Sequence, residues 1–274
     1  MPPIGPGPLP TPTPSTQVFA GAGDIAMCDA QGDEMTASLL DRIGGTLFAL
    51  GDNAYPSGRT EDYRDCYSAS WGRHAGRTYP VPGNHDYESL GAAPYFAYFG
   101  GNAGPSGQGY YSVDLGSWHI ISLNSNIPAD ANSAQGQWLK NDLATYVNFK
   151  CSLAMWHHPL FSSGPNADNT NMRDVWRLLY AAGVEIVLNG HDHDYERFAL
   201  QDADGRLDPA RGVREFVAGT GGGTLRPFVT VHTNSEARIA LSYGVLKLTL
   251  NTDTYQWEFV PVSGQSDSGT GTCH

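Results

Sequence analysis

The stretch TLFALGDNAY, residues 46–55, joins a short apolar run directly to polar side chains. Residues 46–51 have the length and composition of a buried β-strand. The residues that follow supply a carboxylate at Asp52 and a phenol at Tyr55. In open α/β sheets, binding sites form just beyond the carboxyl ends of the strands. This stretch therefore predicts an α/β fold with functional side chains at a strand end.

The same arrangement recurs elsewhere in the chain. Further apolar runs occupy residues 18–23, 78–82, 152–156 and 185–188. The polar residues that follow these runs are Asp24, Asn84, His85, Asp86, His157, His158, His191 and His193. We therefore expect five strands to bring polar side chains to one edge of a sheet.

Segments with helical or alternating periodicity lie between and after these runs. Helices are predicted over residues 33–43, 133–147 and 170–182. Antiparallel pairs are predicted for residues 110–115 with 118–123 and for 245–250 with 255–260. The stretch 90–110, rich in Gly and Tyr, is expected to be a long loop over the site. Because no repeat or second domain is evident, we expect one α/β domain with two sheets over residues 17–274.

Composition narrows the class of protein. The chain has 274 residues, 40% of them hydrophobic, and a formal net charge of −12. This charge argues against a protein that binds nucleic acid or anionic membranes through charge. No stretch approaches the roughly 18–20 apolar residues of a membrane span. We expect a small-molecule substrate; the composition is compatible with a monomer but leaves the oligomeric state open.

The first residues and the cysteines bear on the cellular compartment. Residues 1–16 contain seven prolines and no charged residue, as in a linker, and are expected to follow a removed export signal. The four cysteines form no CxxC pair and allow two disulfides in three pairings. These features favour a secreted or periplasmic protein. A cytosolic protein with free thiols stays open as the alternative.

The residue types at the strand ends suit metal ions. Carboxylate, amide, phenol and imidazole groups without thiolates favour Fe, Mn or Zn. Each Asp or His alone would ordinarily be a loop or cap residue. The cluster as a whole, and not any single member, therefore indicates a metal site. The donors are too many for one tetrahedral zinc, whereas two metals that share a bridging carboxylate would use them. Such pairs act on phosphate esters.

The ordered blocks Asp24, GDNAY (51–55), GNHD (83–86), AMWH (154–157) and GHDH (190–193) resemble the signature of calcineurin-like metallophosphoesterases. They are most similar to the purple acid phosphatases, in the small bacterial-type form without an N-terminal β-sandwich. Two details carry that likeness. Tyr55 follows Asp52 by three residues, and Ala26 stands where most dinuclear relatives have a His. The resemblance implies a two-sheet α/β/β/α sandwich, with the strands after residue 213 in its second sheet.

The resemblance also implies a division of the metal ligands between two sites. One metal would take Asp24, Tyr55 and His193, the other Asn84, His157 and His191, and Asp52 would bridge them. A phenol, with a pKa of about 10, binds best as phenolate to a strongly acidic ion such as Fe(III). The amide and the two imidazoles of the other site suit divalent Fe, Zn or Mn.

The activity implied by the resemblance is hydrolysis of small-molecule phosphate monoesters by attack of a metal-bound hydroxide. His85 is expected to stabilise the transition state or protonate the leaving oxygen. Asp86 would orient His85 or, alternatively, cap a loop, and His158 would face the substrate or be structural. Asp192 departs from the family pattern and is expected to place an acidic group in the mouth of the site.

Two other functions and one disulfide pattern complete the expectations. A phosphodiesterase or nucleotide-directed esterase would use the same metals, and a non-catalytic metal- or phosphate-binding protein could share the fold. Cys28 and Cys66 follow the first two ligand loops and would tie them together. Cys151 and Cys273 would then pin the C-terminus to the start of the fourth strand. Four free thiols would refute this pairing.

Overall fold

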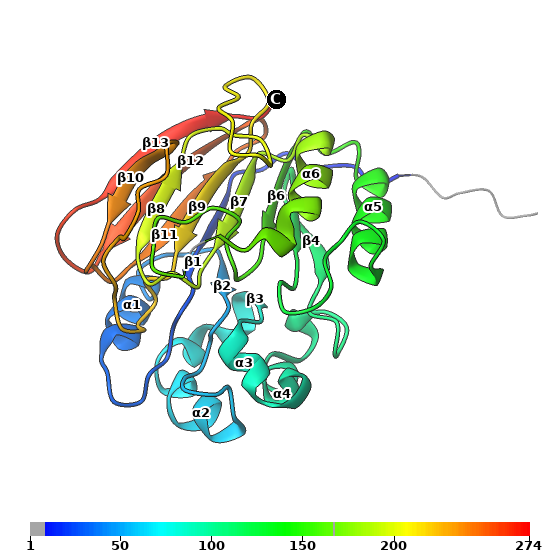
Figure 1. Ribbon diagram of the computed structural model, residues 1–274. Coiled ribbons are helices and arrows are strands. Elements are labelled where there is room, and N and C mark those ends of the chain that lie inside the picture. Colours follow the sequence, from blue (N-terminus) through cyan, green and yellow to red (C-terminus); the bar gives the residue numbers. More distant parts are fainter. Residues whose placement is uncertain (1–8, 167) are drawn as a thin grey trace, which may run out of the picture.

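Two mixed β-sheets form the centre of the computed structural model, which describes residues 9–166 and 168–274 (Figure 1). The first sheet has the order β13-β12-β11-β1-β2-β3 and the second the order β10-β8-β9-β7-β6-β5-β4. The strands of the first sheet are β1 (Gln17–Ala22), β2 (Thr46–Leu50), β3 (Thr78–Val81), β11 (Gly244–Leu250), β12 (Thr254–Pro261) and β13 (Asp267–Thr272). Those of the second are β4 (Tyr111–Leu115), β5 (Trp118–Ser122), β6 (Cys151–Met155), β7 (Ile186–Asn189), β8 (Tyr195–Phe198), β9 (Arg214–Ala218) and β10 (Ser235–Ile239).

The alternation of side chains along the strands explains why the sheets stack. Successive residues of a strand point to opposite faces, so an apolar strand buried on both faces contributes to two cores. In β2, Phe48 and Leu50 join the core between the sheets, which also contains Met155 of β6. Leu47 and Ala49 point the other way and join a second core beneath the helices. The strands are thus covered on both sides.

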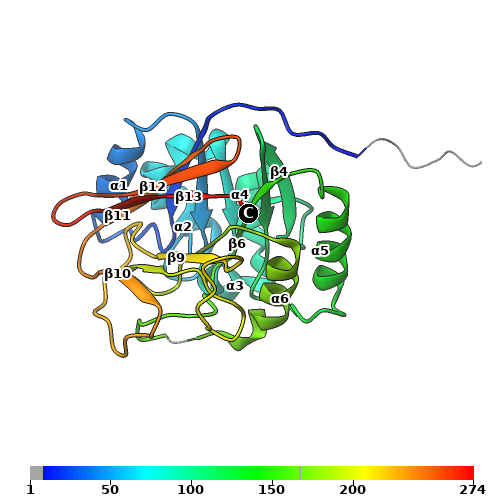
Figure 2. The same cartoon turned by 90° about the horizontal axis from the view of Figure 1, so that it is seen from above.

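Helices complete the outer layers on both sides of the stacked sheets (Figures 1 and 2). The α-helices are α1 (Gly32–Leu40), α2 (Thr60–Asp65), α3 (Asn84–Glu88), α4 (Ala93–Phe99), α5 (Ala134–Thr145) and α6 (Arg173–Ala182). Short 3-10 helices are η1 (Tyr67–Ala69), η2 (Trp71–Arg77), η3 (Leu90–Ala92), η4 (Gly100–Ala103) and η5 (Thr170–Met172). Leu39 and Leu40 of α1 pack on the first sheet, whereas Leu139 of α5 and Trp176 of α6 pack on the second. The predicted α/β/β/α sandwich is confirmed. Among the described helices, none combines the length and the apolar character needed to cross a bilayer.

The predicted strands and helices are confirmed to within a few residues, but their assignment to sheets was partly wrong. The five strands that lead to polar residues do not share one sheet, because β1, β2 and β3 lie in the first and β6 and β7 in the second. Their carboxyl ends still meet because the two sheets stack. The expectation that all strands after residue 213 form the second sheet was also wrong. β11 pairs antiparallel with β1, so β11, β12 and β13 extend the first sheet.

The stretch 90–110 is not the long loop that we predicted, because it contains α4 between two short 3-10 helices. Pro94 stands in the first turn of α4, where its missing N–H group leaves no helical hydrogen bond unmade. Tyr95, Phe96 and Phe99 are buried on the side that packs beneath the first sheet. Their i, i+1, i+4 spacing is the sequence signal that could have identified this helix.

Both expected disulfides are present. Cys28 is bonded to Cys66, and Cys151 to Cys273; none of the described cysteines is free. The first bond ties the loop after β1 to the end of α2. The second ties the segment after β13 to the start of β6, as predicted.

Candidate metal centre

The loops at the carboxyl ends of strands from both sheets converge on one cluster of polar side chains. Asp24 follows β1, Asp52 and Tyr55 follow β2, Asn84 begins α3 after β3, His157 follows β6, and His191 and His193 follow β7. The structure thus brings together the seven residues that the sequence suggested as metal ligands, and their potential donor atoms form two groups.

The first group gathers around the hydroxyl oxygen of Tyr55. This oxygen lies 3.0 Å from Oδ1 of Asp24, 3.3 Å from Oδ2 of Asp52 and 3.1 Å from Nε2 of His193. Nε2 of His193 lies 3.3 Å from Oδ1 of Asp24. Two carboxylate oxygens, a phenol oxygen and an imidazole nitrogen therefore face one small volume.

The second group gathers around Nε2 of His157. This nitrogen lies 3.1 Å from Oδ1 of Asn84 and 3.3 Å from Oδ2 of Asp52. The ring of His191 is 5.0 Å from that of His157, centroid to centroid. Oδ2 of Asp52 is therefore shared by the two groups, which is the position that a bridging carboxylate would take.

Hydrogen bonds to backbone carbonyls fix which nitrogens face the centre. Nδ1 of His157 lies 2.7 Å from the carbonyl oxygen of Leu50, and Nδ1 of His193 lies 2.7 Å from that of Thr224. A carbonyl oxygen can only accept, so Nδ1 carries the proton in both rings and a neutral ring offers its Nε2 lone pair to the centre. In that neutral form, Nε2 of His157 and Oδ2 of Asp52 face each other as two electron-rich atoms. A cation between them would satisfy both, so the donor set fits metal ions.

The side chains of the site shift one another's pKa values. Burial opposes charge on His157, but Asp52 outweighs it and raises the pKa of His157 to about 9. Burial likewise opposes charge on Asp52, and His157 nevertheless lowers the pKa of that carboxyl. Burial and the carboxylates of Asp24 and Asp52 raise the pKa of Tyr55 well above its usual value. Burial and the nearby His157 lower the pKa of His191 to about 4. A metal at this site would therefore replace protons on His157 and Tyr55.

Backbone strain is concentrated in the same loops. Asp24, Asp52 and His191 have φ angles of 59°, 47° and 71°, in the left-handed region that non-glycine residues seldom occupy. Such conformations cost about 1–3 kcal/mol each and cluster at functional sites. Gly83 is required for a different reason: a Cβ atom there would lie 2.1 Å from Oδ1 of Asp52.

His85 lies at the accessible edge of the centre, with its side chain 33% exposed. Its backbone N–H donates to Oδ1 of Asp52 over 2.8 Å. Its Nδ1 lies 2.6 Å from the carbonyl oxygen of Pro56 and 3.2 Å from Oε1 of Glu88. Its Nε2 is 3.9 Å from Oδ2 of Asp52, on the side of the shared carboxylate. Because Nδ1 carries the proton donated to Pro56, Nε2 is the nitrogen that can exchange a proton at the centre.

Asp86 turns away from the ring of His85. Its carboxylate accepts hydrogen bonds from the Tyr63 hydroxyl at 2.6 Å, the Gly83 N–H at 2.8 Å and Nδ2 of Asn53 at 2.9 Å. Burial raises the pKa of this fully buried carboxyl to about 6. These contacts link the loop after β2, which carries Asn53, to the loop after β3, which carries Gly83. They favour the loop-capping alternative over a role in orienting His85.

His158 lies beside the second donor group, with its ring centroid 4.9 Å from that of His157. Its Nδ1 is 2.8 Å from Oγ of Ser125, and its ring centroid is 4.3 Å from that of His191. One nitrogen from each of His157, His158 and His191 can lie within 4.8 Å of the others, an arrangement that could hold a metal ion. Ser125 was not among the residues predicted from the sequence, although it follows β5 just as the ligands follow their strands.

The expectation that Asp192 places an acidic group in the mouth of the site was wrong. Its side chain is fully buried and accepts hydrogen bonds from the Ser162 hydroxyl and from the N–H of Asn166, the latter over 3.0 Å. The backbone turn between the two histidines directs it into the protein.

Comparison with known proteins places this fold and site in a family. Residues 19–195 match the family model described as calcineurin-like phosphoesterase, and the chain belongs to this family. Its sequence relatives include purple acid phosphatases. Purple acid phosphatase 15 of Arabidopsis thaliana is 32% identical over 67% of this chain and 40% of its own length. Purple acid phosphatase 18 of the same plant is 29% identical over 74% of this chain and 49% of its own length.

A solved structure supports the fold independently. The chain superimposes with a TM-score of 0.78 on the purple acid phosphatase PPD1 of yellow lupin (Lupinus luteus), at 18% identity, over 96% of this chain and 55% of the lupin chain. The chain thus spans about half the length of these relatives.

Proposed function

We propose that this protein hydrolyses phosphate esters, with a preference for monoesters, at a centre of two metal ions. The observation that carries the proposal is Oδ2 of Asp52, which belongs to both donor groups at once. Membership of the calcineurin-like phosphoesterase family and the resemblance to plant purple acid phosphatases support this choice.

The two donor groups define which residues would hold each ion. The first ion would be bound by Asp24, Tyr55, His193 and the shared Asp52, and the second by Asn84, His157, His191 and Asp52. The phenol of Tyr55, whose pKa is raised by burial and two carboxylates, releases its proton most readily to a trivalent ion, so we assign Fe(III) there. The second ion would be divalent Fe, Zn or Mn. Such a pair supplies Lewis acidity that polarises water and the phosphoryl oxygens.

His85 would be the residue that transfers a proton during hydrolysis. The Pro56 carbonyl holds the Nδ1 proton in place, and Oε1 of Glu88 lies 3.2 Å from the same nitrogen. When protonated, Nε2 can donate its proton to the leaving oxygen or to the phosphoryl group. Asp86 would act as a positioning residue, because it braces the loops that carry Asp52 and Asn84. His158, held by Ser125, would line the substrate side of the second ion.

The same structure supports the proposals on domain organisation and location. Side chains from both sheets share one core, so we assign residues 17–274 to a single domain. The two disulfides favour an oxidising compartment, outside the cytosol. The substrate would be a small phosphate ester.

The test combines metal analysis with activity. We expect close to two ions per chain, including iron, and hydrolysis of p-nitrophenyl phosphate that a chelator abolishes and the metals restore. Faster hydrolysis of bis(p-nitrophenyl) phosphate would favour the phosphodiesterase alternative. Full metal content without hydrolysis of any ester would overturn the proposal and favour the non-catalytic alternative.

A further inference from the structure

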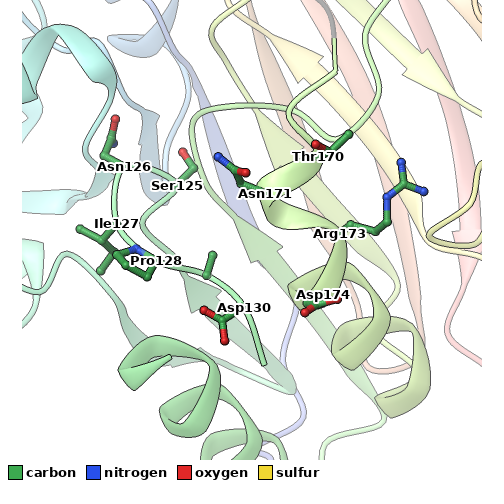
Figure 3. A pocket seen from close by; sticks show the side chains of 10 residues that line it. Ser125, Asn126, Ile127, Pro128, Asp130, Thr170, Asn171, Arg173 and Asp174 are labelled. Carbon is green, nitrogen blue, oxygen red and sulfur yellow. The ribbon is translucent and has the colours of Figure 1, made fainter. Parts of the chain in front are cut away.

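A cavity of about 590 Å³ lies next to Ser125, the hydrogen-bond partner of His158 (Figure 3). The loop after β5 forms one wall, and η5 with the start of α6 forms the other. Ser125 connects the cavity to His158. It lines the cavity, and its hydroxyl accepts a hydrogen bond from the His158 N–H over 3.1 Å. Asn126 also lines it, and its Nδ2 donates to the Pro82 carbonyl, just before the loop that carries Asn84. One end of the cavity therefore lies next to His158 and to the loop that carries Asn84.

The cavity offers unused hydrogen-bonding groups. The side chains of Thr170 and Asn171 are exposed and make no hydrogen bond to any described residue. Nδ2 of Asn126 donates to the Pro82 carbonyl and to Oδ1 of Asn124, whereas its own Oδ1 accepts no hydrogen bond from a described residue and can accept one from a ligand. In Figure 3, Asn171 lies across the opening from Ser125 and Asn126. Hydroxyl and amide groups thus line both walls and match the hydroxyl groups of a ligand.

The charge of the cavity selects against anions. Asp130 and Asp174 lie at one end of it (Figure 3). Among the lining residues, Arg173 carries positive charge, and its guanidinium is 3.2 Å from Asp204 and 3.1 Å from the Ala203 carbonyl oxygen. A leaving group with further phosphates would therefore meet the carboxylate of Asp130, the carboxylate of Asp174, which lies 3.3 Å from a guanidinium nitrogen of Arg177, and an arginine that is already paired. This arrangement offers an anion no unpaired positive charge. The volume is in the range that accommodates small organic ligands.

We propose that this cavity binds the leaving group of the ester, and that this group is uncharged and rich in hydroxyls, a sugar or polyol. This inference rests on the proposed function, because the phosphate end would be held at the two metals. Asn171 and Thr170 would bind hydroxyl groups from one wall, and the two carboxylates would accept hydrogen bonds from hydroxyls at their end of the cavity.

The test compares three substrates on the metal-loaded protein: p-nitrophenyl phosphate, glucose 6-phosphate and pyrophosphate. For Asn171→Ala we expect kcat/KM for glucose 6-phosphate to fall by about three- to tenfold, the effect of one lost hydrogen bond, and to stay within about twofold for p-nitrophenyl phosphate. Asp130→Asn keeps an oxygen for the hydrogen bonds from Asn132 and Ser133 but removes the charge, and should raise kcat/KM for pyrophosphate. Asn141→Ala, at an exposed position on α5, is the matched control and should change none of these values.

A second readout does not depend on activity. In saturation-transfer NMR, glucose should bind to metal-free wild-type protein and to Asn141→Ala, and more weakly to Asn171→Ala. Hydrolysis of p-nitrophenyl phosphate with no effect of Asn171→Ala on glucose 6-phosphate would overturn this inference and leave the proposed function standing. No hydrolysis of any of the three substrates would overturn the proposed function and the inference with it.

Discussion

Nδ1 of His157 donates a hydrogen bond to the backbone carbonyl of Leu50, over 2.7 Å. Leu50 is the last residue of β2 in the first sheet, whereas His157 follows β6 in the second. This bond therefore joins the two sheets at the edge where the metal centre lies. Because it uses the Nδ1 proton, it also sets the tautomer that presents Nε2 to Asp52 and Asn84.

The first prediction concerns His157 itself. Replacing it by alanine removes a nitrogen donor from the second group and leaves the Tyr55 group intact. We expect His157→Ala to bind about one ion instead of two and to lose about 10²–10³-fold in kcat, the range for removal of one electrostatic group from a site. Elemental analysis and p-nitrophenyl phosphate hydrolysis measure both effects. His232→Ala, at a histidine paired with Asp168 outside the centre, is the control. Two ions retained in His157→Ala would contradict the assignment.

Tyr55→Phe tests the ferric site. The substitution keeps the ring but removes the hydroxyl that lies 3.0 Å from Asp24 and 3.1 Å from His193. A ferric phenolate absorbs visible light by charge transfer, so we expect a visible band in the iron-loaded wild type and none in the variant. Tyr98→Phe, whose hydroxyl contacts Ser68 instead, should keep the band. Identical spectra for wild type and Tyr55→Phe would exclude the phenolate as a ligand.

The sequence predicted the elements of the fold better than their pairing. Apolar runs such as those at β2 and β7 are local signals, and they were sufficient to predict these strands and the side chains that follow them. Sheet membership is a long-range property: Gly21 of β1 pairs with Leu246 of β11, and neither run specifies its partner. For the same reason the sequence could not show that β6 lies in a different sheet from β2.

In the site, the identity of the clustered residues was predictable but their orientation was not. The position of Asp52 and Tyr55 directly after a strand was enough to predict that they belong to the cluster. Asp86 and Asp192 stand equally close to ligands in sequence, yet both turn into the protein. Their direction depends on partners far away along the chain, such as Tyr63 and Ser162, which contact them only in the folded structure.

Replacement of His85 separates proton transfer from metal binding. His85→Asn should keep two ions, because the ring of His85 does not belong to either donor group. We expect kcat for p-nitrophenyl phosphate to fall by about 10²–10⁴-fold, the usual contribution of a general acid or base. His232→Asn serves as the matched control for the loss of an imidazole. An active variant with full metal content would rule out the role given to His85.

The disulfide between Cys151 and Cys273 should contribute strongly to stability. It joins residues separated by 122 positions and fixes the end of the chain to β6. Removing a native disulfide costs about 2–5 kcal/mol. The double variant Cys151→Ala with Cys273→Ala should therefore unfold at a lower urea concentration than the oxidised wild type. Wild type treated with a reductant should show a similar or larger loss, since both disulfides then open. Equal midpoints for variant and wild type would refute this contribution.

Glu215, on β9, gives the stability of the protein a dependence on pH. It is fully buried; its Oε1 accepts from the N–H groups of Leu160 and Phe161, and Oε2 has no partner among the described residues. Burial, reinforced by the nearby Glu196, raises the pKa of Glu215 well above its usual value of 4.5. A carboxyl with a raised pKa in the folded state stabilises the fold below its unfolded pKa, and this stabilisation is lost as the pH rises towards the folded pKa.

Glu215→Gln should remove this dependence, because glutamine keeps the accepting oxygen and cannot ionise. We expect the variant to match the wild type in unfolding free energy near pH 4 and to exceed it at pH 8 by about 1 kcal/mol or more, the equivalent of a single pKa unit. Urea unfolding at a series of pH values measures the difference. Glu61→Gln, at an exposed position of α2, should change the curve at neither pH. A constant difference between Glu215→Gln and wild type from pH 4 to 8 would show that Glu215 does not titrate with folding, and that its buried oxygen is satisfied in another way.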